Sequence, residues 1–493
     1  MDDSRLKILL VATEAVPFAK EGGVADVMGS LPRDLARLGH DVRVFLPRYG
    51  TIDPARWRLV HTGVVKRFWF AGAEQSVHVW QTTLPDSPVT VYLLDHEGYF
   101  GRHQRLYLGQ DQLDEQRRFA LFSRGVLECL PDLDFLPDII HLNDWQTAPI
   151  AAYLRTTFRP LLRRGACRIV YTVHNLQYQG RWDPGILDDA GLDRATLYTP
   201  VGLEYWGDVN WMKAGITYAD VITTVSRRYA EEIQTLDYGW GLDELLFQRH
   251  TRVFGIANGI DWDEWNPETD QNIAQQFTAE TASEGKRANR TALREEFGLP
   301  DEPDVPVVGV VSRLVDQKGF DLVAALEDQL SALPFQVVVL GSGQPRYEKI
   351  FRDLAAGSDN VRARIGFDVA LSHRIYAGSD FFLMPSAFEP GGLGQLIALR
   401  YGTLPVVHAT GGLADTVTDL NAHSKTGNGI SFDAYEADAL LNALRRALAL
   451  YAGRKQWPKL VARAMAYDSR WSASANAYDQ LYHRVLRLPP TTM

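Results

Sequence analysis

Short apolar runs alternate with longer amphipathic stretches along almost the whole chain, and this rhythm restricts the folds it can adopt. Most of the short runs are continuously apolar rather than alternating between apolar and polar residues. Such runs are typical of parallel strands whose two faces are both covered by helices. Strands are predicted at 6–12, 41–46, 89–94, 138–142, 168–174 and 221–225 in the first half, and at 252–256, 305–311, 335–340, 381–384 and 404–407 in the second.

This rhythm predicts an α/β protein with two doubly wound units. A length of 493 residues suggests more than one domain, and a composition that is 46% hydrophobic and 23% charged lets each domain bury a core. We place a first domain at 1–250, a second at 251–470, and a tail at 471–493. The tail is predicted to be helical because its apolar residues fall at helical spacing.

The overall composition excludes several kinds of protein. A formal net charge of -10 argues against a nucleic-acid binder, which usually carries a basic face. Cys129 and Cys167 are too few for a disulfide framework, which suits a reducing compartment. No apolar run approaches the roughly 20 residues that span a bilayer, and the N-terminus lacks the pattern of a secretory signal. We therefore expect a soluble, cytoplasmic protein that binds neither nucleic acid nor membranes.

Glycines and one carboxylate gather where the predicted strand 381–384 ends. The segment reads Phe388-Glu389-Pro390-Gly391-Gly392-Leu393-Gly394 and leads into a helix-like run. Glycine lets a ligand approach the backbone, and a helix N-terminus offers free N–H groups to oxygen-rich ligands. Arg313 and Lys318 follow the strand 305–311 in the same way. Ligands of doubly wound sheets bind outside the carboxyl ends of the strands, so this set suits a sugar carried on a diphosphate.

Comparable residues follow other predicted strands. Those singled out as candidate ligand contacts are Lys20, Gly22, Gly23, Asp144, His174, Asn175, Asn258 and Phe367. A lysine beside two glycines at a helix mouth stabilises phosphate charge through the ammonium and the helix dipole together. The guanidinium of arginine donates paired hydrogen bonds to phosphate oxygens, whereas lysine supplies a point charge. Arg313 and Lys318 together therefore fit a diphosphate clamp.

Each candidate also has an ordinary structural interpretation. Lys20, Arg313 and Lys318 could be solvated surface cations, and Glu389 could be a helix N-terminal carboxylate held by backbone N–H groups. His174 could be a satisfied core histidine, and Asp144 a helix cap. Asn258 could simply mark a turn, because Asn-Gly pairs do so, and Phe367 could be a core aromatic.

Motifs of several other chemistries are missing from the sequence. There is no G-x-S-x-G elbow, no Cys/His spacing for zinc and no Walker-type lysine motif. The pair Gly341 and Gly343 lacks the rest of a dinucleotide fingerprint. We therefore predict neither a metal site nor a bound cofactor.

Taken as a set, these segments resemble the bacterial glycogen synthase and plant starch synthase family. The segments that carry the resemblance are Lys20-Glu21-Gly22-Gly23 with Asp26-Val27, His373-Arg374-Ile375, Phe388-Glu389-Pro390 with Gly392-Leu393, 398–405 and 410–416. The chain departs from the family pattern at four places: Glu21, where Thr is usual, Val24-Ala25, where Leu-Gly is usual, Gly392, where Cys is usual, and Gly394, where Thr is usual. Ile397 stands where another GT-B family places a second glutamate, as expected for a synthase-type pattern.

The resemblance implies a GT-B glycosyltransferase with two Rossmann-like domains facing a deep cleft. The first domain would bind the growing glucan, the second the nucleotide sugar, and the tail helix would cross back to the first. The implied reaction is glucose transfer from ADP-glucose to the non-reducing end of an α-1,4-glucan, with retention of configuration and without a metal. Glu389, His174, Arg313 and Lys318 would be catalytic. The residues that would bind substrate are Lys20, Gly22, Gly23, Asp144, Asn175, Asn258, Phe367, Gly391, Gly392, Leu393 and Gly394.

Two alternatives stay open at this point. One is an enzyme of the same fold that uses UDP-glucose or a different acceptor. The other is a glucan-binding protein without catalysis, which the presence of Lys20, His174, Arg313, Lys318 and Glu389 disfavours.

Overall fold

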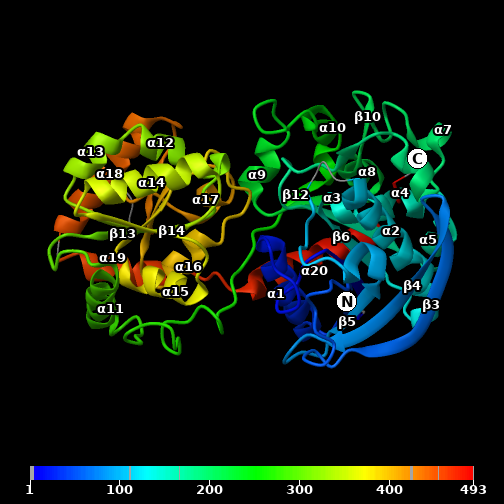
Figure 1. Cartoon of the computed structure of the whole chain (residues 1–493), viewed down its shortest axis with the longest axis horizontal. Coiled ribbons are helices and arrows are strands. Elements are labelled where there is room, and N and C mark those ends of the chain that lie inside the picture. Colours follow the sequence, from blue (N-terminus) through cyan, green and yellow to red (C-terminus); the bar gives the residue numbers. More distant parts are fainter. Residues whose placement is uncertain (1–4, 110–112, 166, 422–425, 454, 492–493) are drawn as a thin grey trace. The chain divides into compact units, whose positions relative to one another are not determined.

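The computed structural model describes residues 5–109, 113–165, 167–421, 426–453 and 455–491. The chain forms two compact units (Figure 1). The first consists of Met1–Asn258 together with Trp471–Met493, and the second is Gly259–Arg470. Each unit has its own large cluster of buried apolar side chains.

A nine-stranded sheet forms the centre of the first unit, in the order β12-β11-β7-β6-β1-β2-β5-β4-β3. From β12 to β5 the neighbours are parallel. Their bounds are β1 Lys7–Val11, β2 Asp41–Pro47, β5 Thr90–Asp95, β6 Ile139–Asn143, β7 Arg168–Val173, β11 Val221–Thr224 and β12 Val253–Gly255. Every residue of β6 is buried, as expected of a strand covered on both faces.

The antiparallel edge of this sheet was not predicted. It consists of β3 (Val60–Phe70) and β4 (Ala73–Thr83), which pair with each other, and β4 also pairs with β5. Exposed and buried positions alternate along much of β3, so it has no continuous apolar run. A small separate sheet of β8 (Arg181–Trp182), β10 (Asp208–Asn210) and β9 (Glu204–Tyr205) was missed for its brevity.

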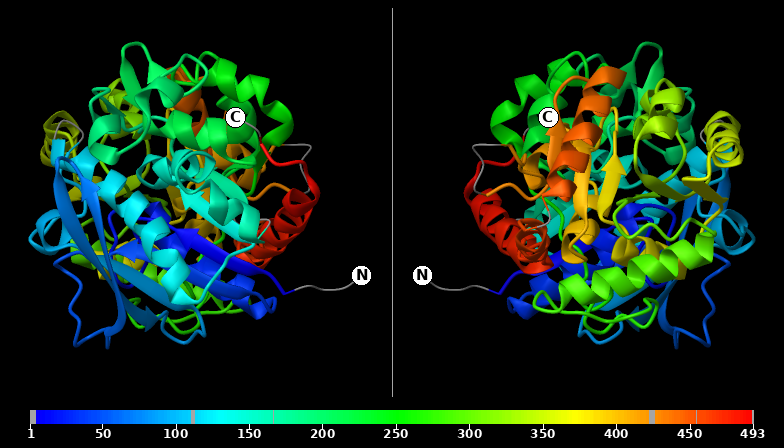
Figure 2. Two further views of the ribbon diagram at one scale, coloured as in Figure 1. Left: turned by 90° about the vertical axis from the view of Figure 1, so that its right-hand side faces the viewer. Right: turned by 90° about the vertical axis from the view of Figure 1, so that its left-hand side faces the viewer.

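Helices cover both faces of the large sheet. The helices of this unit include α1 (Gly23–Arg37), α2 (Leu113–Cys129), α3 (Asp144–Thr147), α4 (Pro149–Arg155), α8 (Trp211–Tyr218), α10 (Asp243–Gln248) and α20 (Trp471–Arg487). The C-terminal helix α20 packs on α1, and Figure 2 shows it in red along one side of the unit. The Tyr482 hydroxyl lies 2.8 Å from Nδ1 of His141 in β6, so α20 is bonded to a central strand.

A six-stranded parallel sheet forms the second unit, in the order β15-β14-β13-β16-β17-β18. The bounds are β13 Val307–Val311, β14 Gln336–Gly341, β15 Val361–Ile365, β16 Phe381–Met384, β17 Leu404–His408 and β18 Ile430–Phe432. The doubly wound α/β class is therefore confirmed for both units. The prediction was wrong in detail at three strands: the strand at 252–256 pairs with β11 in the first sheet, and β15, which contains Arg362 and Arg364, and the three-residue strand β18 were missed.

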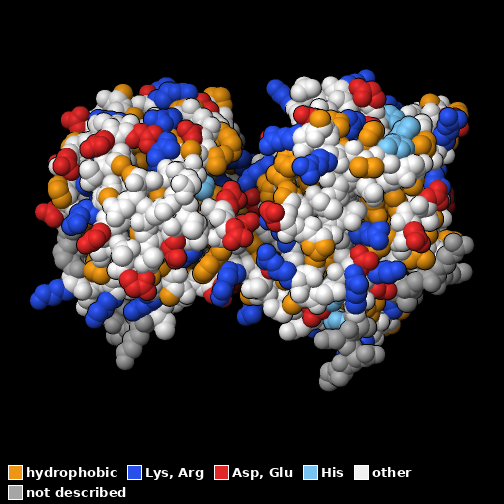
Figure 3. Space-filling view, turned by 90° about the horizontal axis from the view of Figure 1, so that it is seen from below, with side chains coloured by type: hydrophobic (Ala, Val, Ile, Leu, Met, Phe, Trp, Pro, Cys, Tyr) orange, Lys and Arg blue, Asp and Glu red, His pale blue; other side chains and the backbone are white. Residues whose placement is uncertain are grey.

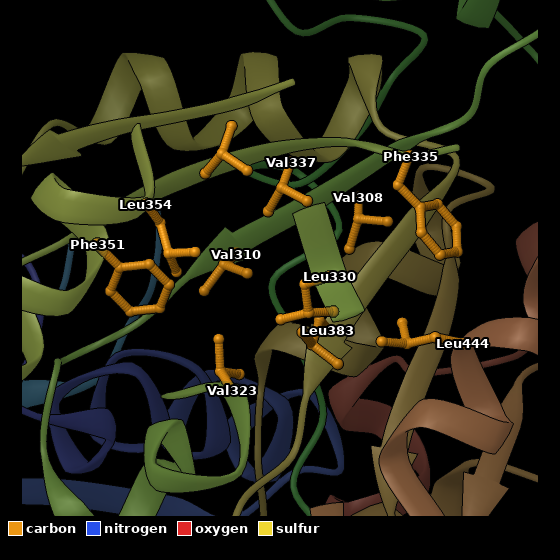
Figure 4. A pocket seen from close by; sticks show the side chains of 11 residues that line it. Val308, Val310, Val323, Leu330, Phe335, Val337, Phe351, Leu354, Leu383 and Leu444 are labelled. Carbon is orange, nitrogen blue, oxygen red and sulfur yellow. The ribbon is translucent and has the colours of Figure 1, made fainter. Parts of the chain in front are cut away.

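Two layers of helices enclose the second sheet. One layer consists of α12 (Phe320–Ala324), α13 (Glu327–Ala332), α14 (Pro345–Gly357) and α18 (Ala437–Ala452), and the other includes α11 (Ala282–Phe297), α15 (Val369–Gly378), α16 (Gly394–Arg400) and α19 (Trp457–Met465) (Figure 1). A cavity of about 30 Å³ lies between the sheet and the first layer. Only apolar side chains line it, among them Val310, Phe351 and Leu444 (Figure 4), so it is a small packing gap rather than a polar site.

Acidic and basic side chains are interspersed on the face that Figure 3 shows. Among the helices of the described residues, none combines the length and hydropathy needed to span a bilayer.

Candidate active site

The first unit changes winding direction at β1, which lies between β2 and β6. At such a switch point the loops after neighbouring strands separate and leave a crevice in which α/β proteins bind ligands. The loops after β1, β6 and β7 carry Lys20, Asp144 and His174, so these three predicted residues all lie along one edge of the sheet.

A buried carboxylate, Glu14, holds the turn that opens α1. Its Oε2 accepts hydrogen bonds from the backbone N–H groups of Glu21 at 2.6 Å and Gly22 at 2.7 Å. Its Oε1 accepts one from the Tyr107 hydroxyl at 2.5 Å, and only 2% of the residue is exposed. Glu14 therefore fixes the Lys20 loop from within. Sequence reasoning missed it, since it belongs to no motif that was recognised.

Lys20 extends from this fixed turn towards solvent. Its Nζ lies 2.6 Å from Oδ1 of Asp26 in the first turn of α1, and its side chain is 46% exposed. An exposed pair of this kind contributes about 1 kcal/mol or less to stability. The ammonium can therefore exchange Asp26 for an anionic ligand at small cost.

His174 is held as a neutral imidazole at the end of β7. Its Nε2 lies 2.9 Å from the Asn143 side-chain oxygen, and the Asn143 amide nitrogen donates to the Val11 carbonyl at 3.0 Å. Because that amide group is oriented by Val11, the oxygen must accept and Nε2 must carry the proton. Burial lowers the pKa of His174 to about 4, so the ring is uncharged at neutral pH.

Asp144 stands beside His174 in a strained backbone conformation. Its φ of 56° is left-handed, which is uncommon for residues other than glycine and is typical of functional sites. The carboxylate accepts the His174 backbone N–H at 2.8 Å. Burial raises the pKa of Asp144 to about 7, although the N–H groups of His174 and Asn175 act in the opposite direction. Asp144 caps the β7 loop rather than its own helix, α3.

The switch point of the second unit lies between β13 and β16, and it brings the predicted cation and carboxylate together. Lys318 Nζ is 2.6 Å from Oε2 of Glu389, and the Ser386 hydroxyl donates to the same oxygen at 3.0 Å. Glu389 is 5% exposed. Its carboxylate is therefore held by an ammonium and a hydroxyl rather than by backbone N–H groups, which was the ordinary interpretation of this residue. Ser386 is a further residue that sequence reasoning missed.

Close backbone packing sets the position of the Glu389 loop. A Cβ added to Gly319 would lie 1.9 Å from the Pro385 carbonyl oxygen, and one added to Gly412 would lie 1.9 Å from that of Gly391. The Gly412 N–H donates to the Glu389 carbonyl at 2.9 Å. These contacts require glycine, because any side chain would push the loops after β13, β16 and β17 apart.

The Gln395 side chain ties down the glycines that precede α16. Its amide nitrogen donates to the carbonyls of Gly391 at 3.1 Å and Gly392 at 3.0 Å. At Gly394, an added Cβ would lie 3.0 Å from the Phe382 ring. The space that the family's usual threonine would occupy is therefore tight in this chain. Leu393, next to Gly394, is the N-cap residue of α16.

Two predicted residues of the second unit are exposed. Arg313 follows β13, and no partner for its guanidinium is found in the described part of the chain. Phe367 follows β15 and is 86% exposed, so the interpretation as a core aromatic was wrong. In the first unit, Asn258 is half-buried and is the last residue before the chain enters the second unit. Within the described ranges, no three His, Cys, Asp or Glu side chains form a metal-binding group.

Two α/β units, each built around parallel strands, with a cation–carboxylate pair at the switch point of the second, define a glycosyltransferase of the GT-B class. Residues 7–248 match the family described as starch synthase catalytic domain, and residues 289–460 match glycosyl transferases group 1. The chain belongs to the bacterial glycogen synthase and plant starch synthase family.

Individual relatives agree with this assignment over the whole length of the chain. A glycogen synthase of Geotalea daltonii is 46% identical over 98% of this chain and 99% of its own, and one of Moorella thermoacetica is 46% identical over 98% and 97%. The catalytic domain of Arabidopsis thaliana starch synthase IV, solved with ADP and acarbose, is 37% identical, with a TM-score of 0.90 over 98% of this chain and 100% of that one. Sucrose-phosphate synthase of Thermosynechococcus elongatus shares the fold. It is 19% identical, with a TM-score of 0.58 over 98% of this chain and 99% of that one.

Proposed function

We propose that this chain transfers glucose from ADP-glucose to the 4-hydroxyl at the non-reducing end of an α-1,4-glucan, with retention of configuration. The observation that carries the proposal is the Lys318–Glu389 pair, 2.6 Å apart at the switch point, with the exposed Arg313 on the same loop. The ADP bound by the starch synthase relative supports the choice of nucleotide. We place the enzyme in the cytoplasm, which suits its two buried free cysteines.

The second unit would hold the donor. Arg313 and Lys318 stabilise negative charge on the diphosphate as its bond to glucose breaks, by preorganised charged hydrogen bonds. Phe367 offers an exposed ring for the adenine at the end of β15, two strands from β13. Strands lie about 4.8 Å apart, so base and diphosphate contacts are separated by roughly 10 Å, a span that a nucleoside diphosphate can bridge.

The first unit would hold the glucan and the reacting sugar. Neutral His174 and its neighbour Asn175 present hydrogen-bonding groups to sugar hydroxyls, and Asp144 fixes the His174 backbone. Lys20, on the turn fixed by Glu14, presents an exposed ammonium to an anionic group of the ligand. Asn258 adds a further polar contact near the end of this unit.

The chemistry requires one bond exchange and one proton transfer. The bond between C1 of glucose and the diphosphate oxygen breaks, and the acceptor O4 forms a bond to C1 on the same face. The O4 proton passes to the departing phosphate oxygen. Glu389, stripped of most of its hydration, supports either the glucosyl hydroxyls or the positive charge that develops on the ring. No step requires a metal ion.

Product analysis with radiolabelled ADP-glucose or UDP-glucose on glycogen tests the proposal. We expect label from ADP-glucose to enter glycogen and to be released as maltose by an exo-acting β-amylase, with chelator present throughout. Incorporation only from UDP-glucose would refute the donor assignment. Glycogen binding without incorporation from either donor would refute catalysis.

A further inference from the structure

Two Trp-Gly pairs of the first unit share an unusual backbone conformation. Trp206 and Gly207 have φ values of 50° and 90°, and Trp240 and Gly241 have values of 49° and 78°. A left-handed φ is an outlier for a bulky residue such as tryptophan. Such strain persists only where the surrounding structure enforces it, and it is found preferentially at functional sites.

The first pair forms the tip of a hairpin. Tyr205 pairs with Asp208 across β9 and β10, so Trp206 and Gly207 are the two central residues of a type I′ turn. Asparagine, aspartate or glycine is preferred at the position of Trp206. The turn therefore carries a tryptophan where a small residue would be more stable, and that tryptophan is 79% exposed.

Hydrogen bonds fasten the second pair to this hairpin. The Tyr205 hydroxyl donates to the Trp240 carbonyl at 2.8 Å, and the Gln179 amide donates to the same oxygen at 3.0 Å. A Cβ added to Gly241 would lie 3.7 Å from the Trp206 ring. Trp206 and Trp240, 34 residues apart in sequence, are thus neighbours on one surface.

The surface combines a flat aromatic face with a polar rim. The Trp206 ring stacks on Tyr205, with centroids 5.2 Å apart and an interplanar angle of 16°, and its other face is open. Trp240 is 43% exposed. Beside them, Arg181 pairs with Asp208 at 2.9 Å, and both side chains are substantially exposed. The Arg181 guanidinium also lies over the Tyr205 ring, 5.0 Å from its centroid, so this ion pair flanks the stacked Tyr205 and Trp206 rings and supplies hydrogen-bond donors and acceptors there.

We propose that Trp206 and Trp240 form a second glucan-binding site, a surface platform that holds the polymer away from the reacting end. The apolar faces of glucose units stack on flat rings while their hydroxyls reach the Arg181–Asp208 pair, which matches both halves of this surface. A protein partner would instead need an interface of about 800 Å² per side with a core depleted of charge. The inference rests on the proposed function for its choice of α-glucan over other carbohydrates.

The platform is tested with Trp206→Asn, Trp240→Asn and the double variant, since asparagine suits the left-handed turn. Trp69→Thr is the matched control, because Trp69 is 67% exposed but lies in the edge strand β3. In native gels that contain glycogen, the wild type should migrate more slowly than in gels without it, and we expect the double variant to show no such slowing. Its KM for glycogen should rise about tenfold, with kcat and the KM for maltotriose unchanged and the melting temperature equal or higher.

The outcomes separate this inference from the proposed function. If the wild type binds glycogen through these tryptophans but incorporates no glucose, the platform stands and the proposed function fails. The platform is refuted if the wild type elongates glycogen and the double variant behaves like it, with the same retardation in glycogen-containing gels and the same rate of elongation. A change of oligomeric state in the double variant, with glycogen binding intact, also refutes it and marks the patch as a protein interface.

Discussion

Glu14 of the first unit and Glu389 of the second are both buried carboxylates beside a glycine-rich turn that opens a helix, yet different groups hold them. Backbone N–H groups and a tyrosine hydroxyl hold Glu14, whereas a lysine and a serine side chain hold Glu389. A backbone donor cannot leave without unfolding the turn, but an ammonium can turn towards a phosphate. The difference is the one expected between a carboxylate that maintains the architecture, as Glu14 does, and one that acts on a ligand, as proposed for Glu389.

Replacing Glu389 gives the largest expected effect. In Glu389→Gln, turnover should fall by about 10²–10³-fold, as when one preorganised electrostatic group is lost. The free energy of unfolding should change by only about 1 kcal/mol, since Lys318 remains partly hydrated. Initial rates and urea denaturation measure the two quantities. A variant that retains half of normal turnover would remove Glu389 from the reaction.

Replacing Arg313 or Lys318 should slow turnover in both cases but should affect the stability of the fold differently. Arg313→Gln and Lys318→Met should each slow turnover by about 10²-fold through lost stabilisation of the diphosphate. Lys318→Met should also destabilise the fold by about 1–3 kcal/mol, because Glu389 loses its counter-ion. Arg313→Gln should stay within about 0.5 kcal/mol of wild type, as expected for an exposed side chain. Equal stability of the two variants would contradict the geometry of the pair.

Glu14 should show the reverse balance. Glu14→Ala leaves the N–H groups of Glu21 and Gly22 and the Tyr107 hydroxyl without their acceptor. We expect a loss of about 2–4 kcal/mol in the free energy of unfolding, with Glu14→Gln as the milder control because its amide oxygen still accepts. If Glu14→Ala unfolds like wild type but is inactive, Glu14 is a ligand-contacting group like Glu389.

The smallest effect concerns Asp144 and depends on pH. Its pKa of about 7 lies above the ordinary value of 3.8, so the folded protein binds this proton more tightly than the unfolded chain does. Its contribution to stability is therefore complete below about pH 4 and is lost as the pH rises to 7. Asp144→Asn avoids this loss and should be more stable than wild type at pH 8 by about 1–2 kcal/mol, given about 1.4 kcal/mol per pKa unit and partial exposure.

His174 acts in the opposite direction over part of the same range. Its pKa of about 4 lies below the ordinary 6.5, so stability falls as the pH drops through that interval. In Asp144→Asn only the His174 contribution remains, so the free energy of unfolding should rise more steeply between pH 4 and 6.5 than it does in the wild type. Denaturant titrations at several pH values measure both slopes, and parallel curves for variant and wild type would show that Asp144 is ionised throughout.

How far the site could be predicted depended on whether a residue belonged to a recognisable pattern at the end of a predicted strand. Lys318 and Glu389 follow adjacent strands of a predicted parallel sheet, so their meeting could be expected from topology alone. Glu14 and Tyr107 are brought together by tertiary packing, and neither belongs to a local pattern. The same holds for β3 and β4, whose alternating burial makes them half-exposed edge strands instead of continuous apolar runs.

The position of α20 has a consequence for how the protein is made. The first unit begins the chain but includes its last helix, whose Tyr482 is bonded to His141 of a central strand. On the ribosome the second unit is therefore fully synthesised before the first has all its parts. Domains usually mature in order of synthesis, but here the N-terminal unit must wait for the end of translation. A nascent chain stalled after Arg470 should hold a folded second unit and a protease-sensitive first one.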